Sequence, residues 1–232
     1  MQNTLIQYHF RRTSNFREAF VFELAAADLK LISHMPVRPP AWTELDFHQC
    51  PNCPLDIAAH PFCPLAANLV NIVNRMESLI SYDEIRVDVI TAERIISQVT
   101  TAQIGISSML GLVIATSGCP HAAFFRPMAR FHLPLASKEE TIFRATSMYL
   151  LAQYFVKKDG RTADLELEGL TRIYDNMQIV NIAIVERLRA ATKTDSSINA
   201  IVILDTFAKS LPFAIEKSLD EIRHLFAPFL VH

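Results

Sequence analysis

Glycine is the residue that this chain most clearly lacks. Only five glycines occur among 232 residues, where an average usage of about 7% predicts roughly 16. They are Gly105, Gly111, Gly118, Gly160 and Gly169. Phosphate-binding loops and dinucleotide fingerprints need glycines at fixed short offsets, so nucleotide binding by those modes is excluded. The scarcity also favours helices over a turn-rich sandwich or barrel.

A strong charge and a long apolar run are missing as well. The formal net charge is −2, which provides no basic field for binding nucleic acid. The most apolar run, 104–115, contains two serines and is shorter than the ~20 residues of a membrane span. The first residues show no basic segment followed by an apolar one, as a signal peptide would. We therefore expect a cytoplasmic protein that binds neither nucleic acid nor membrane.

The chain has enough apolar material for a core of its own. Half of its residues are hydrophobic, and a typical domain has about 100 to 200 residues. We expect one domain, residues 1–232, of the α+β class and predominantly helical. A small N-terminal antiparallel sheet of three to four strands would pack on a bundle of about five helices. Residues 1–91 would hold the sheet, a proline-rich loop and a cysteine-rich segment, and residues 92–232 the helical part.

Alternating apolar residues predict strands near the N-terminus. Residues 6–10 and 20–24 alternate on either side of a polar turn, which indicates a hairpin. Residues 28–33 are expected to form a third strand and 85–89 a fourth. The proline-rich stretch 34–48 cannot sustain a helix or a central strand and is expected to be an ordered loop.

Apolar residues at steps of three and four predict helices over most of the remaining chain. Ser137 followed by Glu140 is typical of a capping box at a helix start. The expected helices cover 64–80, 91–117, the segment that begins after Ser137, 170–188, and 198–222 with a kink at Pro212.

The four cysteines carry the strongest functional signal. They are Cys50, Cys53, Cys63 and Cys119, and each is followed by proline. With 12 prolines in the chain, composition alone gives this result with a probability of about one in a hundred thousand. In a cytosolic chain, a C-x2-C pair with further cysteines indicates metal binding or catalysis before it indicates disulfides.

Proline after cysteine has a structural explanation. Proline is favoured at the first position of a helix, so the preceding cysteine would occupy the N-cap. We expect this at Cys63, and also at Cys53 and Cys119 with short helical turns over 54–59 and 120–125. Free N–H groups and the helix dipole favour a thiolate there, and thiolates bind metals. Two or three helix N-termini are thus expected to direct their cysteines toward one centre.

The spacing of the cysteines does not decide which metal they would bind. One pair and two single cysteines on separate elements are typical of a cluster, most simply [4Fe–4S], although the ferredoxin run of cysteines is absent. Structural zinc usually uses two paired knuckles. His48, His60 and His121 flank the cysteines and could replace one of them, or could hydrogen-bond around the site. Apolar packing of free thiols would leave the prolines unexplained.

A second group of polar residues follows Cys119. Arg126, Arg130, His132, Glu140 and Arg144 lie among apolar neighbours. They could form an anion or small-molecule pocket beside the metal, or a set of salt bridges that hold the loop to the bundle. Glu140 and Arg144 are four residues apart on the expected helix and could pair.

Four further polar residues lie within strongly apolar helical segments. Buried hydrogen bonds between helices would explain them without a ligand. They are Arg187, Arg189, Asn199 and Asp205.

The segments around Cys50, Cys53, Cys63 and Cys119 resemble an uncharacterised bacterial protein family of similar length. HQCPNCPLDIAAHPFCPLA and the stretch beginning SGCPHAAFFRPMARFH carry the resemblance, which extends over the whole chain. It implies a bacterial source and a domain that occurs as a standalone protein, and no activity.

Three functions fit these observations. The first is a protein that holds one iron–sulfur cluster on its four cysteines for electron transfer or redox sensing, with a protein partner or a second copy of itself. The second is a structural zinc module that binds another protein. The third is a cluster-dependent enzyme that acts on a small anionic substrate through Arg126, Arg130, His132 and Glu140.

Overall fold

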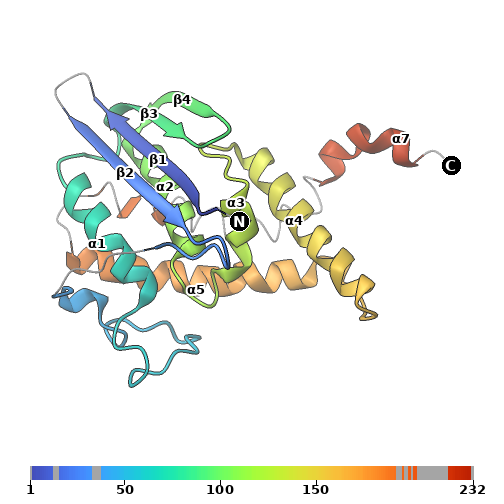
Figure 1. Ribbon diagram of the computed structural model, residues 1–232, viewed down its shortest axis with the longest axis horizontal. Helices are drawn as coiled ribbons and strands as arrows, with labels where there is room; N and C mark the ends of the chain where they lie inside the picture. Colours follow the sequence, from blue (N-terminus) through green and yellow to red (C-terminus); the bar gives the residue numbers. More distant parts are fainter. Residues whose placement is uncertain are drawn as a thin grey trace.

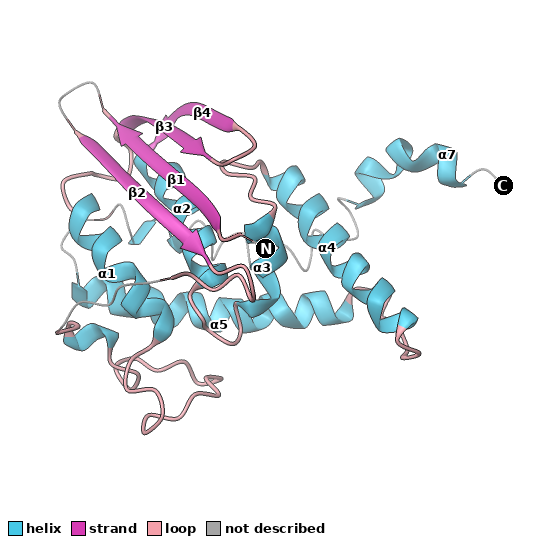
Figure 2. Cartoon of the chain, viewed as in Figure 1, coloured by secondary structure: helices cyan, strands magenta, loops and turns pink. Residues whose placement is uncertain are grey.

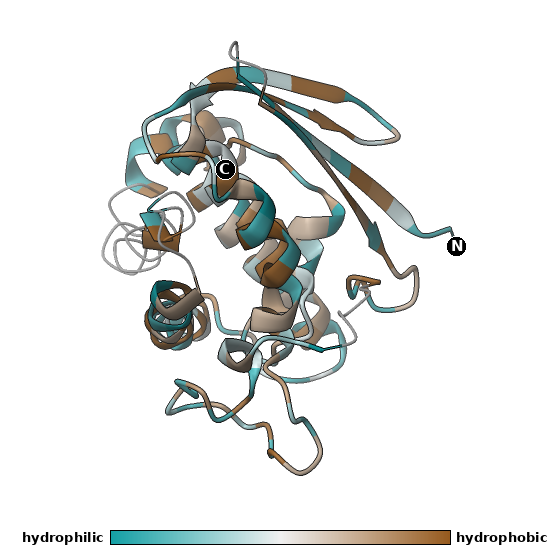
Figure 3. Cartoon of the chain, turned by 90° about the vertical axis from the view of Figure 1, so that its left-hand side faces the viewer, coloured by the Kyte–Doolittle hydropathy of each residue, from teal (hydrophilic) through white to brown (hydrophobic). Residues whose placement is uncertain are grey.

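A four-stranded antiparallel sheet forms one layer of the protein, with strand order β2-β1-β3-β4. The computed structural model describes residues 2–12, 16–32, 38–191, 195, 198–199, 201–202 and 219–230. The strands are β1 (Thr4–Arg11), β2 (Arg17–Leu24), β3 (Glu84–Ile90) and β4 (Ile95–Thr101). Figures 1 and 3 show the helices gathered on one face of this sheet.

The sequence correctly predicts three of the four strands. β1 and β2 form the expected hairpin, with Tyr8 paired to Phe20. Alternation buries Ile6, Tyr8 and Phe10 on the helix-facing side, because successive side chains of a strand point to opposite faces. β3 pairs with β1 and contributes the buried Val87 to the same face.

Two expectations about the sheet are wrong. Residues 91–101 form a turn and the edge strand β4, not the start of a helix, because β-branched residues dominate the segment and favour extended backbone. The third strand expected over 28–33 is not formed in its described part. That part contains a turn, Leu29 at φ 58°, and a single bridge between Leu24 and Leu31.

The described residues form six α-helices with three short 3-10 turns. The helices are α1 (Pro64–Met76), α2 (Ala102–Thr116), α3 (Arg126–Arg130), α4 (Lys138–Lys158), α5 (Glu168–Ala191) and α7 (Ala227–Leu230), and the 3-10 turns are Ala41–Thr43, Ala123–Phe125 and Arg223–Phe226. Figure 2 shows the segment that leads into α1 as mostly loops. No helix in the described ranges is long and apolar enough to cross a membrane.

The helix boundaries follow local chemistry. α4 begins at the expected capping box, in which Ser137 Oγ accepts from the Glu140 N–H at 3.1 Å and Glu140 accepts from the Ser137 N–H at 2.7 Å. α1 ends at Met76 and not at residue 80, because Leu79 continues the chain in a turn. The expected helix over 198–222, with Pro212, lies largely outside the described residues.

α2 packs directly against the sheet and forms the centre of the main core. A Cβ atom at Gly105 would lie 2.8 Å from Val87 Cγ2 and 3.3 Å from the Phe10 ring, so only glycine allows this close approach. Leu110 and Val113 of α2 are completely or almost completely buried there. A smaller core cluster between α4 and α5 includes Ala145 and Leu170. α2 is thus fixed between the sheet and the outer helices.

Candidate metal centre

Cys63 occupies the N-cap of α1, as its proline predicts. Pro64 is the first residue of the helix, and the Ala67 N–H donates to the Cys63 carbonyl at 2.9 Å. The Cys63 N–H donates to the Thr43 carbonyl at 2.8 Å, which anchors the residue to the preceding loop. The side chain makes no capping hydrogen bond, so the thiol is not engaged by the helix terminus.

Cys50 and Cys53 lie at the two ends of one tight turn. The Cys53 N–H donates to the Cys50 carbonyl at 2.9 Å across Pro51 and Asn52. The helical turn expected over 54–59 is absent. Its place is taken by an irregular turn in which the His60 N–H donates to the Asp56 carbonyl at 2.8 Å. Cys53 is therefore held by the turn that precedes it and not by a helix N-terminus.

Cys119 follows α2 across a glycine with φ +93°, a backbone angle that favours glycine. Its N–H donates to Ser117 Oγ at 3.2 Å, and its carbonyl accepts from the Ala122 N–H at 3.2 Å. The turn over 120–122 leads into the 3-10 turn Ala123–Phe125. The short helical segment expected after Cys119 is therefore present in 3-10 form.

Hydrogen bonds link these three segments to one another. His121 donates from Nε2 to the Asn52 carbonyl at 2.7 Å, which joins the Cys119 loop to the Cys50–Cys53 turn. Asn68 of α1 donates to the carbonyls of Pro64 at 2.7 Å and Ser117 at 3.3 Å. The segments that carry the cysteines are thus connected although Cys119 follows Cys63 by 56 positions.

The four thiols are free and half-buried. Burial and the neighbouring thiols of Cys63, Cys119 and Cys53 raise the pKa of Cys50 to about 12. Burial is also the main cause of the raised pKa of Cys119, to which the thiols of Cys63 and Cys53 add. The thiols of Cys50 and Cys119 are therefore close enough to the other cysteines for their charges to interact. Within the described ranges, no group of three or more His, Cys, Asp or Glu side chains forms a ready-made metal site.

A buried arginine contacts the loop that precedes Cys50. Arg187 of α5 is 1% exposed and donates to the carbonyls of Trp42, Glu44 and Leu45 at 2.7–2.9 Å. Its positive charge lowers the pKa of Cys50, and its buried Nε has no hydrogen-bond partner among the described residues. The sequence indicates a buried hydrogen-bonding role for Arg187. It gives no sign that the partners belong to the loop before the cysteines, because no motif links positions so far apart.

The three flanking histidines are not equivalent. His121 joins two cysteine segments through its ring. His48 and His60 are exposed, and the His48 ring packs edge-on against Phe47 at 4.8 Å. His121 therefore connects the Cys119 loop to the Cys50–Cys53 turn, whereas the other two make no such link among the described residues.

The polar group after Cys119 does not assemble as a unit. Arg130 lies 3.8 Å from Glu93, and Glu140 is engaged in its capping box. The expected ion pair between Glu140 and Arg144 is not formed among the described residues, because Arg144 extends to carbonyl groups. It donates to Met128 at 3.0 Å, Phe131 at 3.2 Å and Leu133 at 3.3 Å. Arg126 has a buried Nε without a partner in the described part of the chain.

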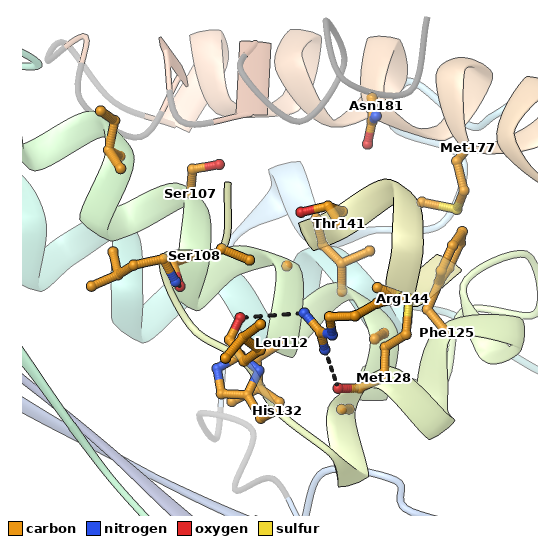
Figure 4. Close-up of a pocket in the computed structure, with 18 of the residues that line it drawn as sticks. Ser107, Ser108, Leu112, Phe125, Met128, His132, Thr141, Arg144, Met177 and Asn181 are labelled. Atoms are coloured by element: carbon orange, nitrogen blue, oxygen red, sulfur yellow. Dashed lines mark hydrogen bonds between the residues drawn. The ribbon is translucent and has the colours of Figure 1, made fainter. Parts of the chain in front are cut away.

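His132 and Arg144 alone of this group line a cavity of about 280 Å³ between α2, α3, α4 and α5 (Figure 4). The Tyr8 hydroxyl lies 2.6 Å from His132 Nε2 and 3.0 Å from Ser108 Oγ. Burial lowers the pKa of His132 to about 3, so its ring is neutral at pH 7. Sequence reasoning missed Tyr8, because an inward residue of a strand is expected to pack and its hydroxyl gives no local signal.

The fold is that of an α+β protein in which hydrogen bonds connect the N-terminus of α1 with the two loops that carry the other three cysteines. The chain belongs to the family described as Domain of unknown function (DUF6901), whose model matches residues 6–227. This confirms the expected uncharacterised family over nearly the whole chain. No curated protein and no solved structure matches the chain.

Proposed function

We propose that Cys50, Cys53, Cys63 and Cys119 bind one metal centre, a [4Fe–4S] cluster that transfers electrons or senses redox state. The observation that carries the proposal is the joining of three separate cysteine-proline segments by the His121–Asn52 and Asn68–Ser117 hydrogen bonds. A role in packing alone would require neither these links nor a proline after each cysteine.

The surroundings of the thiols favour a negatively charged centre. Cys63 lies at the positive end of α1, a helix of 13 residues, whose dipole stabilises an anion. Arg187 adds a buried positive charge that acts on Cys50, and no carboxylate pairs with it among the described residues. Four thiolates around a cluster carry net negative charge. Coordination would draw the sulfur atoms together by side-chain rotation, for which the free thiols are available.

A cluster explains the ligand arrangement better than a single zinc ion. One close pair and two single cysteines on separate elements are typical of clusters, whereas structural zinc usually has two paired knuckles. A half-buried position against the main core suits electron transfer to a partner at the surface.

A zinc ion is the second candidate, because the proposed site lies where three segments of the chain meet. A structural zinc ion would lock these loops, and the protein would then act as an interaction module. A cytoplasmic location and a protein partner or homodimer are part of either proposal.

Anaerobic purification followed by an ultraviolet-visible spectrum, with iron, zinc and sulfide measured on the same sample, tests the proposal. We expect a broad band near ~400 nm and about four irons and four sulfides per chain. Cys119→Ser should lose the band and most of the iron. His60→Ala, which changes an exposed histidine between Cys53 and Cys63, should retain both. One zinc per chain and no colour would establish the zinc alternative. Unchanged solubility and metal content in Cys119→Ser would refute the four-cysteine centre.

A further inference from the structure

The cavity of about 280 Å³ is distinct from the cysteine centre. Its walls are largely apolar and include Leu112 of α2, Phe125, Met128 of α3 and Met177 of α5. Small-molecule sites are mostly apolar concave spaces of roughly 300–1,000 Å³ with a few placed polar groups. The volume of the cavity lies just below that range, which suits one compact molecule.

Among the described residues that line this space, Arg144 is the only Asp, Glu, Lys or Arg. Burial lowers the pKa of its guanidinium. Three backbone carbonyls hold the side chain in place. These bonds use three of the five N–H donors of a guanidinium, and no carboxylate forms an ion pair with it among the described residues. His132 is neutral and adds no charge to the wall.

Two buried polar side chains face the same space from other helices. Ser107 of α2 is 5% exposed and Asn181 of α5 is 3% exposed. Neither side chain has a hydrogen-bond partner in the described part of the chain. Figure 4 shows both pointing into the space between the helices, across from Arg144. Both belong to buried residues that line the cavity, so their polar atoms are available to a molecule that binds there.

We infer that this cavity binds a small monocarboxylate with a compact apolar body and a second polar group. The carboxylate would accept hydrogen bonds from the remaining N–H donors of Arg144, a charge-assisted interaction that arginine favours. The apolar body would contact Leu112, Met128 and Phe125. Ser107 and Asn181 would hydrogen-bond to the second polar group at the opposite wall. The inference does not depend on the metal centre.

Binding is tested on the full chain by calorimetry, with phenylacetate, 4-hydroxyphenylacetate and octanoate as probes and their primary amides as neutral controls. We expect at least one of the acids to bind at least tenfold more tightly than its amide, because a charged hydrogen bond in a buried site is strong. Arg144→Gln should weaken that acid at least tenfold. Arg130→Gln, which removes an arginine outside the cavity, should leave its affinity unchanged.

Ser107 supplies a second variant for the case in which Arg144→Gln does not fold. Ser107→Leu removes no hydrogen bond made by the described residues and fills the space, so it should abolish binding while the melting temperature stays the same or rises. Ser107→Ala should weaken 4-hydroxyphenylacetate more than phenylacetate. Equal affinities for acids and amides, no binding by any acid, or unaltered binding in Ser107→Leu would each overturn the inference.

Discussion

The proposed cysteine centre and the cavity are built from different kinds of structure. The thiols are carried by loops and by the start of α1, and each is marked in the sequence by the proline that follows it. The cavity takes its polar groups from α2, α4 and α5, and a tyrosine of β1 supports one wall. A site on loops needs local motifs to shape the backbone, whereas a site between helices needs only a suitable residue at a packed position.

Helices α2 and α5 nevertheless contribute residues to the surroundings of both sites. α2 carries Ser107 near its first turn and leads to Cys119 just past its last. α5 carries Asn181 at the cavity, while Asn176 accepts from the Asn52 side chain at 2.8 Å. Arg187, nearer the end of α5, holds the loop before the cysteines. A change in one site can therefore be tested for its effect on the other.

Arg187→Met is expected to have the largest effect and to act on the cysteine centre. It removes a buried charge and leaves the carbonyls of Trp42, Glu44 and Leu45 without their donor, which should cost about 3 kcal/mol in the free energy of unfolding. Metal content should fall, whereas carboxylate binding in the cavity should persist under conditions where the variant is folded.

Arg189→Met is the matched control for this change, because Arg189 is exposed and pairs with Glu186 on the same helix. It should shift the free energy of unfolding by less than about 0.5 kcal/mol. Urea unfolding measures both variants. Similar losses in the two would show that the loop does not depend on the buried guanidinium.

His132 provides the second prediction, on the cavity side. Its folded pKa of about 3 lies below the unfolded value near ~6.5, so the unfolded chain binds more protons between these values. The neutral ring thus contributes stability that is fully present above about pH 6.5 and is lost as the pH falls toward 3.

Urea unfolding at pH 6.5 and 4.5 checks the sign and size of this effect. Each pH unit is worth at most about 1.4 kcal/mol for one group. The protein should therefore lose about 2 kcal/mol more than His132→Gln over this interval. An identical pH dependence in the two proteins would mean that His132 is not buried in its neutral form.

The sequence predicts the features that depend on neighbours in the chain better than those that depend on helix packing. The hairpin, the capping box at Ser137 and the N-cap at Cys63 depend on neighbours in the chain, and all three are formed. The sequence predicts helix over β4, because the apolar spacing of α2 extends backward into its β-branched residues. Pairing with β3 at the edge of the sheet makes the segment a strand instead.

The contacts that assemble the two sites depend on tertiary packing, and the sequence does not predict them. Nothing near Arg144 indicates that it bonds to three carbonyls rather than to Glu140. The cavity, likewise, depends on residues from Ser107 to Asn181 that meet only after the helices have packed. That the four cysteine-proline repeats form one metal centre stays a prediction. The hydrogen bonds that join their segments have no signal in the sequence.

His121→Ala is the smallest expected change and tests those hydrogen bonds directly. Loss of the bond to the Asn52 carbonyl should cost about 1 kcal/mol in the free energy of unfolding. Metal retention should fall, because the Cys119 loop is no longer fastened to the Cys50–Cys53 turn. His60→Ala should change neither quantity, and carboxylate affinity should be the same in both variants. Full metal retention in His121→Ala would mean that the ligands themselves, and not the link between their loops, hold the centre together.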